Sequence, residues 1–429
     1  MVERGQGRPV ARGAKQTARW SRREIDIFST PKRLSLRALV AHPSSFQLKS
    51  LERMIYLDHN ATTPVLPEVF EAMRPYFCDE WGNPSSAYRF GSKLRTFIGT
   101  AREQVAGLIG ALPEEILFTS CATESNNAAI QAILKSNPAK RHIVTSAVEH
   151  SSVLNHCQAL EKEGCRVTCL PVNRDGLLNM ADLENALTDQ TAVVSLMWAN
   201  NETGVLFPVQ TISELCHERG VLFHCDAVQA AGKVEMNVRE TPVDYLSLSG
   251  HKFYAPKGVG ALFVRRKSPF VPFLHGGHQE NGLRGGTENV PLIVGLGKAA
   301  ELATRRLQNF DAKVRPLRDK LEAGILTKIS NTEVNGHTGL RLANTTNIIF
   351  RGVESETLLV LLDQAGFCAS KGSACLGNSD GPSHVIKAMK PDGVTARESL
   401  RFSLGINSRE DEVHACVDTL VRSVASLRG

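Results

Sequence analysis

Residues 221–252 read VLFHCDAVQAAGKVEMNVRETPVDYLSLSGHK, and this stretch decides the fold. It holds two short, mostly apolar runs, 221–227 and 245–249, with the length of buried strands. Polar residues end the two runs or directly follow them, namely Asp226, Ser249, His251 and Lys252. Polar groups in this position are typical of open α/β sheets, in which ligands bind beyond the carboxyl ends of the strands.

The alternation of short apolar runs with amphipathic stretches continues on both sides, from about residue 100 to residue 265. Residues 151–164 and 208–219 place their apolar side chains on one helical face. The runs expected to be strands are Ile116–Ser120, His142–Val148, Val167–Val172, Ala192–Ala199, Val221–Ala227, Tyr245–Ser249 and Gly260–Val264. This alternation predicts an α/β fold with a mostly parallel seven-stranded sheet between layers of helices.

Beyond residue 289 the pattern changes and predicts a smaller α+β domain. The expected elements are a long helix to residue 328, a strand at Thr345–Phe350, a helix at 354–365, a Gly/Ser-rich loop at 370–381 and a last helix from about residue 409. We therefore expect a disordered basic extension at 1–53, a small domain formed by 54–68 and 307–429, and a large α/β domain at 69–306.

The positive charge is concentrated near the N-terminus. Residues 1–53 hold 12 Lys/Arg against 4 Asp/Glu, so residues 54–429 carry −2 of the total charge of +6. The body of the chain is mildly acidic and gives no indication of nucleic-acid binding. The extension lacks the apolar segment of a secretory signal, and no apolar run is long enough to cross a bilayer. We expect a cytoplasmic protein, or a mitochondrial one if residues 1–53 are a transit peptide.

Two further patterns, the spacing of the cysteines and a glycine-rich segment, are weak evidence for a binding site. The 10 cysteines lack the spacing of a zinc site or of a disulfide framework, which favours free thiols in a reducing compartment. The segment GLGKAA at 295–300 matches a loose dinucleotide-binding pattern, but no strand precedes it. Its surroundings are helical, so we interpret these glycines as points of close helix packing.

Five expected strands are followed by polar residues whose chemistry suits pyridoxal phosphate. These residues are Thr123, His150, Asn201, Asp226 and the group Ser249-His251-Lys252. Thr123 begins an expected helix whose N–H groups suit a phosphate. Asp226 can pair with a pyridine nitrogen, His150 can stack on the ring, and Lys252 offers an amine for a Schiff base. A lone His or Asp at a strand end usually caps a helix, but capping alone does not explain five such ends.

Longer motifs carry a resemblance to a known family. They are YLDHNATTP (56–64), GNPSS (82–86), ATESNN (122–127), VEH (148–150), NNETG (200–204), HCDAVQ (224–229), SGHK (249–252) and GTEN (286–289). In this order they resemble the motifs of the cysteine desulfurases, which belong to the class V group of fold-type I pyridoxal-phosphate transferases. The resemblance extends from about residue 54 to the C-terminus. Cys121 departs from it, since the family has Gly at that position.

The resemblance implies a role for each matching residue. Lys252 would hold the cofactor as a Schiff base, Asp226 would contact its pyridine nitrogen, and His150 would stack on its ring. Further cofactor contacts would come from Ala122, from Thr123, Ser249 and His251 at the phosphate, and from Asn201 and Gln229 at the phenolic oxygen. Thr287 would reach the phosphate in a partner subunit, so the resemblance also implies an obligate homodimer.

Two residues in the last third of the chain would act on the substrate. Cys375, in the segment SKGSAC at 370–375, resembles the mobile catalytic cysteine that takes the sulfur as a persulfide. Cys375 is also a candidate for a shared iron–sulfur ligand. Arg401, in SLRFS at 399–403, matches the clamp for the substrate carboxylate, with Asn201 as a second substrate contact.

The sequence thus predicts a cysteine desulfurase, a sulfurtransferase in which Cys375, Lys252 and His150 are catalytic. It would convert L-cysteine to L-alanine and pass the sulfur to an acceptor protein, such as an iron–sulfur scaffold, for cluster or thio-cofactor synthesis. Three alternatives stay open: a selenocysteine lyase, another class V aminotransferase or lyase, and a non-enzymatic assembly platform.

Overall fold

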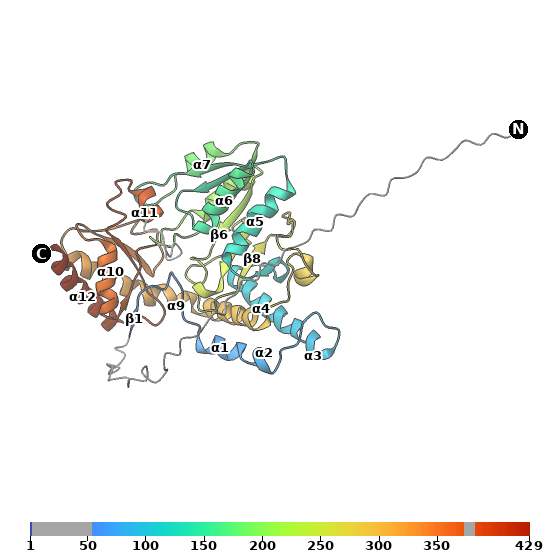
Figure 1. Ribbon diagram of the computed structural model, residues 1–429, viewed down its shortest axis with the longest axis horizontal. Helices are drawn as coiled ribbons and strands as arrows, with labels where there is room; N and C mark the ends of the chain where they lie inside the picture. The colour runs from blue at the N-terminus through green and yellow to red at the C-terminus, as the bar shows by residue number, and fades with distance from the viewer. Residues whose placement is uncertain (2–53, 373–381) are drawn as a thin grey trace, which may run out of the picture. The chain divides into compact units, whose positions relative to one another are not determined.

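The seven-stranded sheet predicted from the alternating pattern is present (Figure 1). The computed structural model describes Met1, residues 54–372 and residues 382–429. The strands of this sheet are β2 (Ile116–Thr119), β3 (His142–Ser146), β4 (Arg166–Leu170), β5 (Thr191–Met197), β6 (Leu222–Asp226), β7 (Tyr245–Ser249) and β8 (Gly260–Val264). Their order is β2-β8-β7-β6-β5-β3-β4, with β8 antiparallel to both its neighbours and the other pairs parallel.

All seven expected strands are confirmed, and β7 and β8 have the expected bounds. The structure ends β3 and β5 two residues before the expected ends, because the chain already turns there into the loops that form the candidate site. The helices that connect these strands are α5 (Ala122–Ser136), α6 (Ser151–Lys162), α7 (Met180–Ala186) and α8 (Val209–Glu218). Their apolar faces and the sheet share buried cores, as the predicted layers require.

A second, three-stranded sheet lies in the C-terminal part of the chain. Its order is β12-β10-β9, and all pairs are antiparallel. The elements of this part are β9 (Thr332–Val334), β10 (Thr345–Phe350), α10 (Ser355–Gln364), α11 (His384–Met389), β12 (Ser399–Ser403) and α12 (Glu410–Arg428), while β1 (Ile55–Tyr56) pairs with β11 (Phe367–Cys368). One apolar core joins α9, α10 and α12 to this sheet. The domain boundaries expected near residues 68 and 306 stay a prediction.

The long helix α9 (Val290–Lys328) explains the glycines of the GLGKAA segment. It packs against α1 (Pro67–Met73) and α4 (Leu94–Ile109), while α2 (Pro75–Cys78) and α3 (Arg89–Ser92) lie between these two in the chain. A Cβ added at Gly297 would lie 2.5 Å from the Cα of Ala101 in α4, and one at Gly295 would lie 2.5 Å from the Met73 sulfur in α1. The interpretation as helix-packing glycines is confirmed.

Some expectations fall outside the described part of the chain. The basic extension, apart from Met1, and most of the Gly/Ser-rich loop at 370–381 belong to residues 2–53 and 373–381. Among the described helices, none combines the length and hydropathy needed to span a bilayer.

Candidate active site

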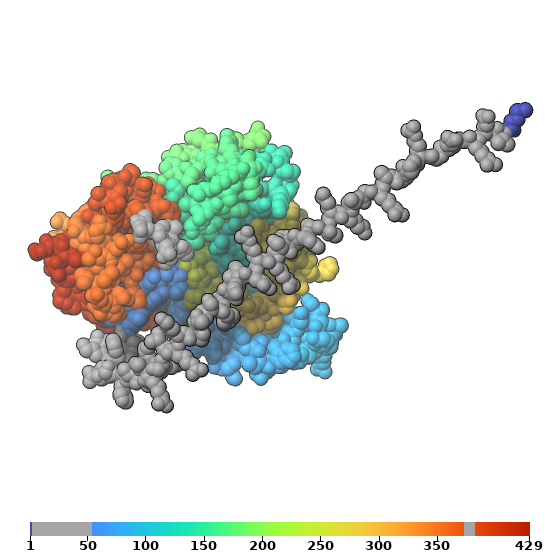
Figure 2. All heavy atoms as spheres, in the orientation of Figure 1, coloured from blue at the N-terminus to red at the C-terminus, as the bar shows by residue number. Residues whose placement is uncertain are grey.

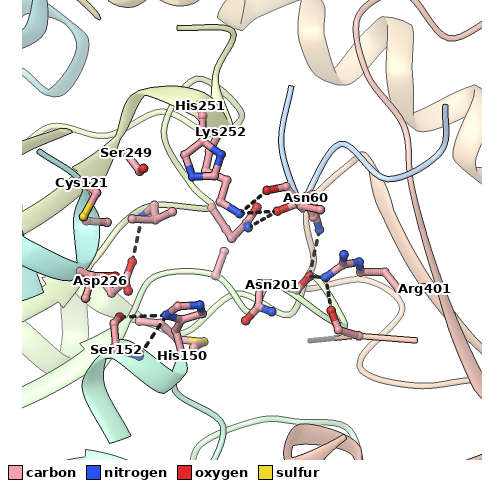
Figure 3. A pocket seen from close by; sticks show the side chains of 18 residues that line it. Asn60, Cys121, His150, Ser152, Asn201, Asp226, Ser249, His251, Lys252 and Arg401 are labelled. Atoms are coloured by element: carbon pink, nitrogen blue, oxygen red, sulfur yellow. Dashed lines mark hydrogen bonds between the residues drawn. The ribbon is translucent and has the colours of Figure 1, made fainter. Parts of the chain in front are cut away.

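Loops that follow β2, β3, β5, β6 and β7 line one cavity at the carboxyl edge of the large sheet (Figure 3). The cavity encloses about 830 Å³, including its open mouth. The predicted site residues that line it are Ala122, Thr123, His150, Asn201, Asp226, Gln229, Ser249, His251, Lys252 and Arg401. The structure therefore brings together residues that are up to about 280 positions apart in the sequence.

Two predicted residues are not among those that line this cavity. Thr287 borders two other surface hollows, one of which it shares with Tyr76 and Trp81. Cys375 lies in residues 373–381, outside the described residues. Gly372, three positions before Cys375, does line the cavity.

The amine of Lys252 is held by the main chain of a distant segment. Its Nζ donates to the carbonyl oxygens of Asn60 and Ala61 at 2.7 and 2.8 Å. Asn60 is buried, and its amide Nδ2 donates to Thr345 in β10 and to the Asn201 carbonyl oxygen. Sequence reasoning did not single out Asn60, although it stands within the quoted motif YLDHNATTP.

The carboxylate of Asp226 is held by two donors. Oδ1 accepts from the backbone N–H of Val228 at 3.0 Å, and Oδ2 accepts from Asn126 Nδ2 at 2.8 Å. The same Asn126 nitrogen donates to Ser152 Oγ at 2.9 Å. Asn126 is buried in α5, and it too belongs to a quoted motif without having been assigned a role.

His150 caps the N-terminus of α6, and this capping fixes its tautomer. The backbone N–H of Ser152 donates to His150 Nδ1 at 3.2 Å, and Ser152 Oγ lies 2.8 Å from the same nitrogen. Because Nδ1 accepts a hydrogen bond from a backbone N–H, the neutral ring carries its proton on Nε2. The network that runs from Asp226 through Asn126 and Ser152 therefore includes His150.

One end of the cavity is suited to an anion. Cys121, Ala122 and Thr123 at the start of α5 line it together with Ser249 and His251. A helix N-terminus presents N–H groups and the positive end of the helix dipole. Burial, Lys252 and other nearby cations lower the pKa of His251 to about 4, so its ring is neutral at pH 7. Its Nδ1 lies 3.1 Å from Thr62 Oγ1.

Arg401, in the middle of β12, lies on the side of the cavity away from Cys121 and Ser249 (Figure 3). Its side chain is only 1% exposed. Nη1 donates to the carbonyl oxygens of Asn201 and Gly372 at 2.9 and 2.7 Å, and Nη2 donates to Asp58 Oδ1 at 2.6 Å. Among the described residues, no hydrogen-bond partner reaches the buried Nε of Arg401.

A fully buried carboxyl group, Glu149, lies beside His150 in the chain. Its Oε1 accepts from Ser146 Oγ at 2.6 Å and from the Met197 N–H at 3.0 Å, which joins the ends of β3 and β5. Burial, with a contribution from the charge of Asp226, raises the pKa of Glu149 to about 8. At pH 7 this carboxyl group is mostly protonated.

Pyridoxal phosphate matches the donor set of the cavity. The helix N-terminus with Ser249 suits its phosphate, the doubly held Asp226 carboxylate suits its ring nitrogen, and the Lys252 amine suits its aldehyde. Among the described residues, no group of three or more His, Cys, Asp or Glu side chains is placed to hold a metal ion.

The chain belongs to the aminotransferase class-V family, whose model matches residues 55–416. Within this family, the chain is similar in sequence to cysteine desulfurases and in structure to NifS-like proteins. A cysteine desulfurase of Trichormus azollae is 52% identical over 375 residues, which are 87% of this chain and 94% of the relative. A solved NifS-like protein superposes with a TM-score of 0.82 at 35% identity, covering 87% of this chain and all of the other (100%). A structure of SspA in complex with cysteine has a TM-score of 0.73 at 38% identity, covering 82% and 98% of the two chains.

Proposed function

We propose that this enzyme is a pyridoxal-phosphate-dependent cysteine desulfurase that converts L-cysteine to L-alanine and takes the sulfur as a persulfide on Cys375. The observation that carries the proposal is the joint lining of one cavity by Lys252, Asp226, His150 and Arg401. The kinship with cysteine desulfurases supports the same reaction.

L-cysteine is the proposed substrate, and Arg401 is its anchor. A guanidinium group held from three sides can offer its remaining donor capacity to a carboxylate with little loss of side-chain entropy. Nε of Arg401, to which no described residue is hydrogen-bonded, is such a donor. The related SspA was solved in complex with cysteine, which supports an amino acid of this size.

Lys252 and His150 are the proposed proton carriers. When bound, pyridoxal phosphate supplies an electron sink for the carbon that carries the substrate amine. Lys252 Nζ then takes the proton from that carbon and later returns a proton to the product. His150 can donate its Nε2 proton to a thiolate in the cavity, since Nδ1 already accepts from Ser152 and the neutral ring carries its proton on Nε2.

Cys375 is the proposed sulfur acceptor. Its thiolate attacks the substrate sulfur, so that an S–S bond forms while the substrate Cβ–S bond breaks, and the electron pair of the broken bond remains with the carbon that becomes the methyl group of alanine. Cys375 is three positions beyond Gly372 at the cavity wall, and three extended residues span at most about 10 Å.

A homodimer is the proposed assembly, with Thr287 of each copy directed to the other. Thr287 shares a surface hollow with Trp81, which is 68% exposed. Phe70, Phe77 and Tyr88 of the same region are exposed as well, and Figure 2 shows this segment in blue and cyan. Exposed aromatic side chains in such number are typical of a protein interface.

The test of the function uses Cys375→Ala. After addition of L-cysteine, the wild-type chain should carry one extra sulfur atom on Cys375, detected by mass spectrometry of the alkylated peptide. Cys375→Ala should keep the cofactor absorbance and carry no persulfide. Alanine formation that survives Cys375→Ala would favour an aminotransferase or another lyase, and a strong preference for selenocysteine would favour a selenocysteine lyase. A chain that binds no cofactor would favour an assembly platform.

The iron–sulfur scaffold as acceptor, the iron–sulfur ligand role of Cys375 and the cytoplasmic location stay predictions from the sequence.

A further inference from the structure

Lys233 is a buried amine that the proposed chemistry does not use. It follows β6 in the stretch HCDAVQAAGK at 224–233, and it is only 8% exposed. Its Nζ donates to Gln229 Oε1 at 2.8 Å and to Asn60 Oδ1 at 3.4 Å. Burial, Lys252 and Arg401 lower the pKa of Lys233 to about 7. Burial of an amine close to other cations costs folding free energy. A lysine kept at such a cost is expected to have a function.

The two hydrogen bonds of the Gln229 side chain define which end of its amide is available. Its oxygen accepts from Lys233, and its Nε2 donates to the Asn60 carbonyl oxygen at 3.0 Å. A reversed amide would place its oxygen against the Asn60 carbonyl oxygen, which is repulsive, and its N–H groups against the Lys233 amine, which is repulsive when that amine is protonated. Gln229 lines the cavity, and its Nε2 keeps a second N–H that it can offer there.

We infer that Lys233 is a positioning residue that makes Gln229 present a hydrogen-bond donor to the cavity, and so selects for a ligand with an oxygen acceptor at that place. This inference rests on the proposed cofactor, whose phenolic oxygen is such an acceptor. Lys233 acts through Gln229, since Gln229 lines the cavity and Lys233 does not.

The test measures the dissociation constant of pyridoxal phosphate by absorbance titration of the full chain, without cysteine. Lys233→Met and Gln229→Ala should each weaken binding about tenfold, the effect of about one lost hydrogen bond. The double variant should bind no more than about twofold more weakly than Gln229→Ala alone, because both changes remove the same contact. Unchanged binding by Lys233→Met, or losses that multiply in the double variant, would overturn the inference.

Two further variants separate positioning from a general loss of stability. Lys390 is another buried lysine, paired with Glu333 far along the chain, and Lys390→Met should leave the dissociation constant unchanged. Gln229→Glu keeps Lys233 intact but presents an acceptor to the cavity, so it should bind the cofactor more weakly than Gln229→Ala does. Equal or tighter binding by Gln229→Glu would contradict the inference even if Lys233→Met failed to fold.

The binding measurements test the role of Lys233 separately from the proposed reaction. Wild-type chain that binds the cofactor but forms no alanine from cysteine would overturn the proposed function and leave the role of Lys233 standing. Wild-type chain that binds no pyridoxal phosphate would overturn both.

Discussion

The two sheets contribute to the cavity in different ways. The seven-stranded sheet contributes polar side chains from the ends of five strands and from the loops that follow them. The three-stranded sheet contributes Arg401, which lies within strand β12 and is held there by backbone pairing to Asn347 of β10. Loop residues can adapt to a ligand, whereas a strand residue held by Asp58, Asn201 and Gly372 keeps one position.

This difference suggests a division of labour in the proposed reaction. The loops of the large sheet surround the site for the cofactor and the proton carriers, and the rigid arginine defines where the substrate carboxylate lies. Substitutions in the loops of the large sheet should therefore abolish the reaction. A substitution of Arg401 should chiefly weaken substrate binding.

The largest effect is expected for Lys252→Ala. The variant lacks the amine proposed for cofactor attachment and proton transfer, so alanine formation should fall by at least about a thousandfold. The measurement is the rate of alanine release from L-cysteine. Lys257→Ala, a change at an exposed lysine five positions away, should keep the wild-type rate.

A smaller effect is expected for Arg401→Lys. Lysine cannot reproduce the planar donor set, so kcat/KM for L-cysteine should fall about a hundredfold, mostly through KM. Arg318 is the matched control, because it is also buried in the same part of the chain but bonds to the carbonyl oxygens of Leu342 and Thr345. Arg318→Lys should change stability alone, and an equal loss of kcat/KM in both variants would contradict the division of labour.

The third prediction concerns stability instead of activity, namely the contribution of Glu149 to the pH dependence of unfolding. The pKa of Glu149 is raised to about 8 from an ordinary 4.5, so the folded state keeps a proton that the unfolded state releases. The contribution of Glu149 to stability is therefore complete below pH 4.5 and is lost as the pH rises toward 8, by at most about 1.4 kcal/mol per pH unit. Glu149→Gln should remove this fall, measured by urea unfolding at pH 5 and pH 8.

Glu322 is the control for the unfolding experiment, because its pKa is shifted in the opposite direction from that of Glu149. Its ion pair with Arg341 and its bond from Thr346 outweigh burial and lower its pKa, so it stays ionised between pH 5 and pH 8. Glu322→Gln should shift the free energy of unfolding equally at both pH values. The same pH slope in the wild type and in Glu149→Gln would contradict the buried, protonated state of Glu149.

The sequence predicted the large sheet well because each of its strands is a short apolar run between amphipathic segments. β12 was not predicted as a strand, since Ser399–Ser403 alternates polar and apolar residues over only five positions. The polar residues at strand ends were predicted as one site because parallel strands bring their carboxyl ends to the same edge. The resemblance to the cysteine desulfurases added Gln229 and Arg401, for which periodicity gives no signal.

The supporting contacts could not be predicted from local pattern. Asn60 meets Lys252 across 192 positions of sequence, and Asp58 meets Arg401 across 343. Asn126 lies in a quoted motif and Lys233 lies between two predicted strands, but their hydrogen bonds depend on side-chain directions that only the packed structure defines. Such contacts arise from tertiary packing, which secondary-structure periodicity does not encode.

The most direct test of the central claim is the simultaneous measurement of alanine and sulfide released by the purified chain from L-cysteine in the presence of a thiol reductant. The proposed reaction predicts equal amounts of the two products, with both lost in Lys252→Ala and in Cys375→Ala. Alanine or pyruvate without an equal amount of sulfide, or release unaffected by Cys375→Ala, would contradict it.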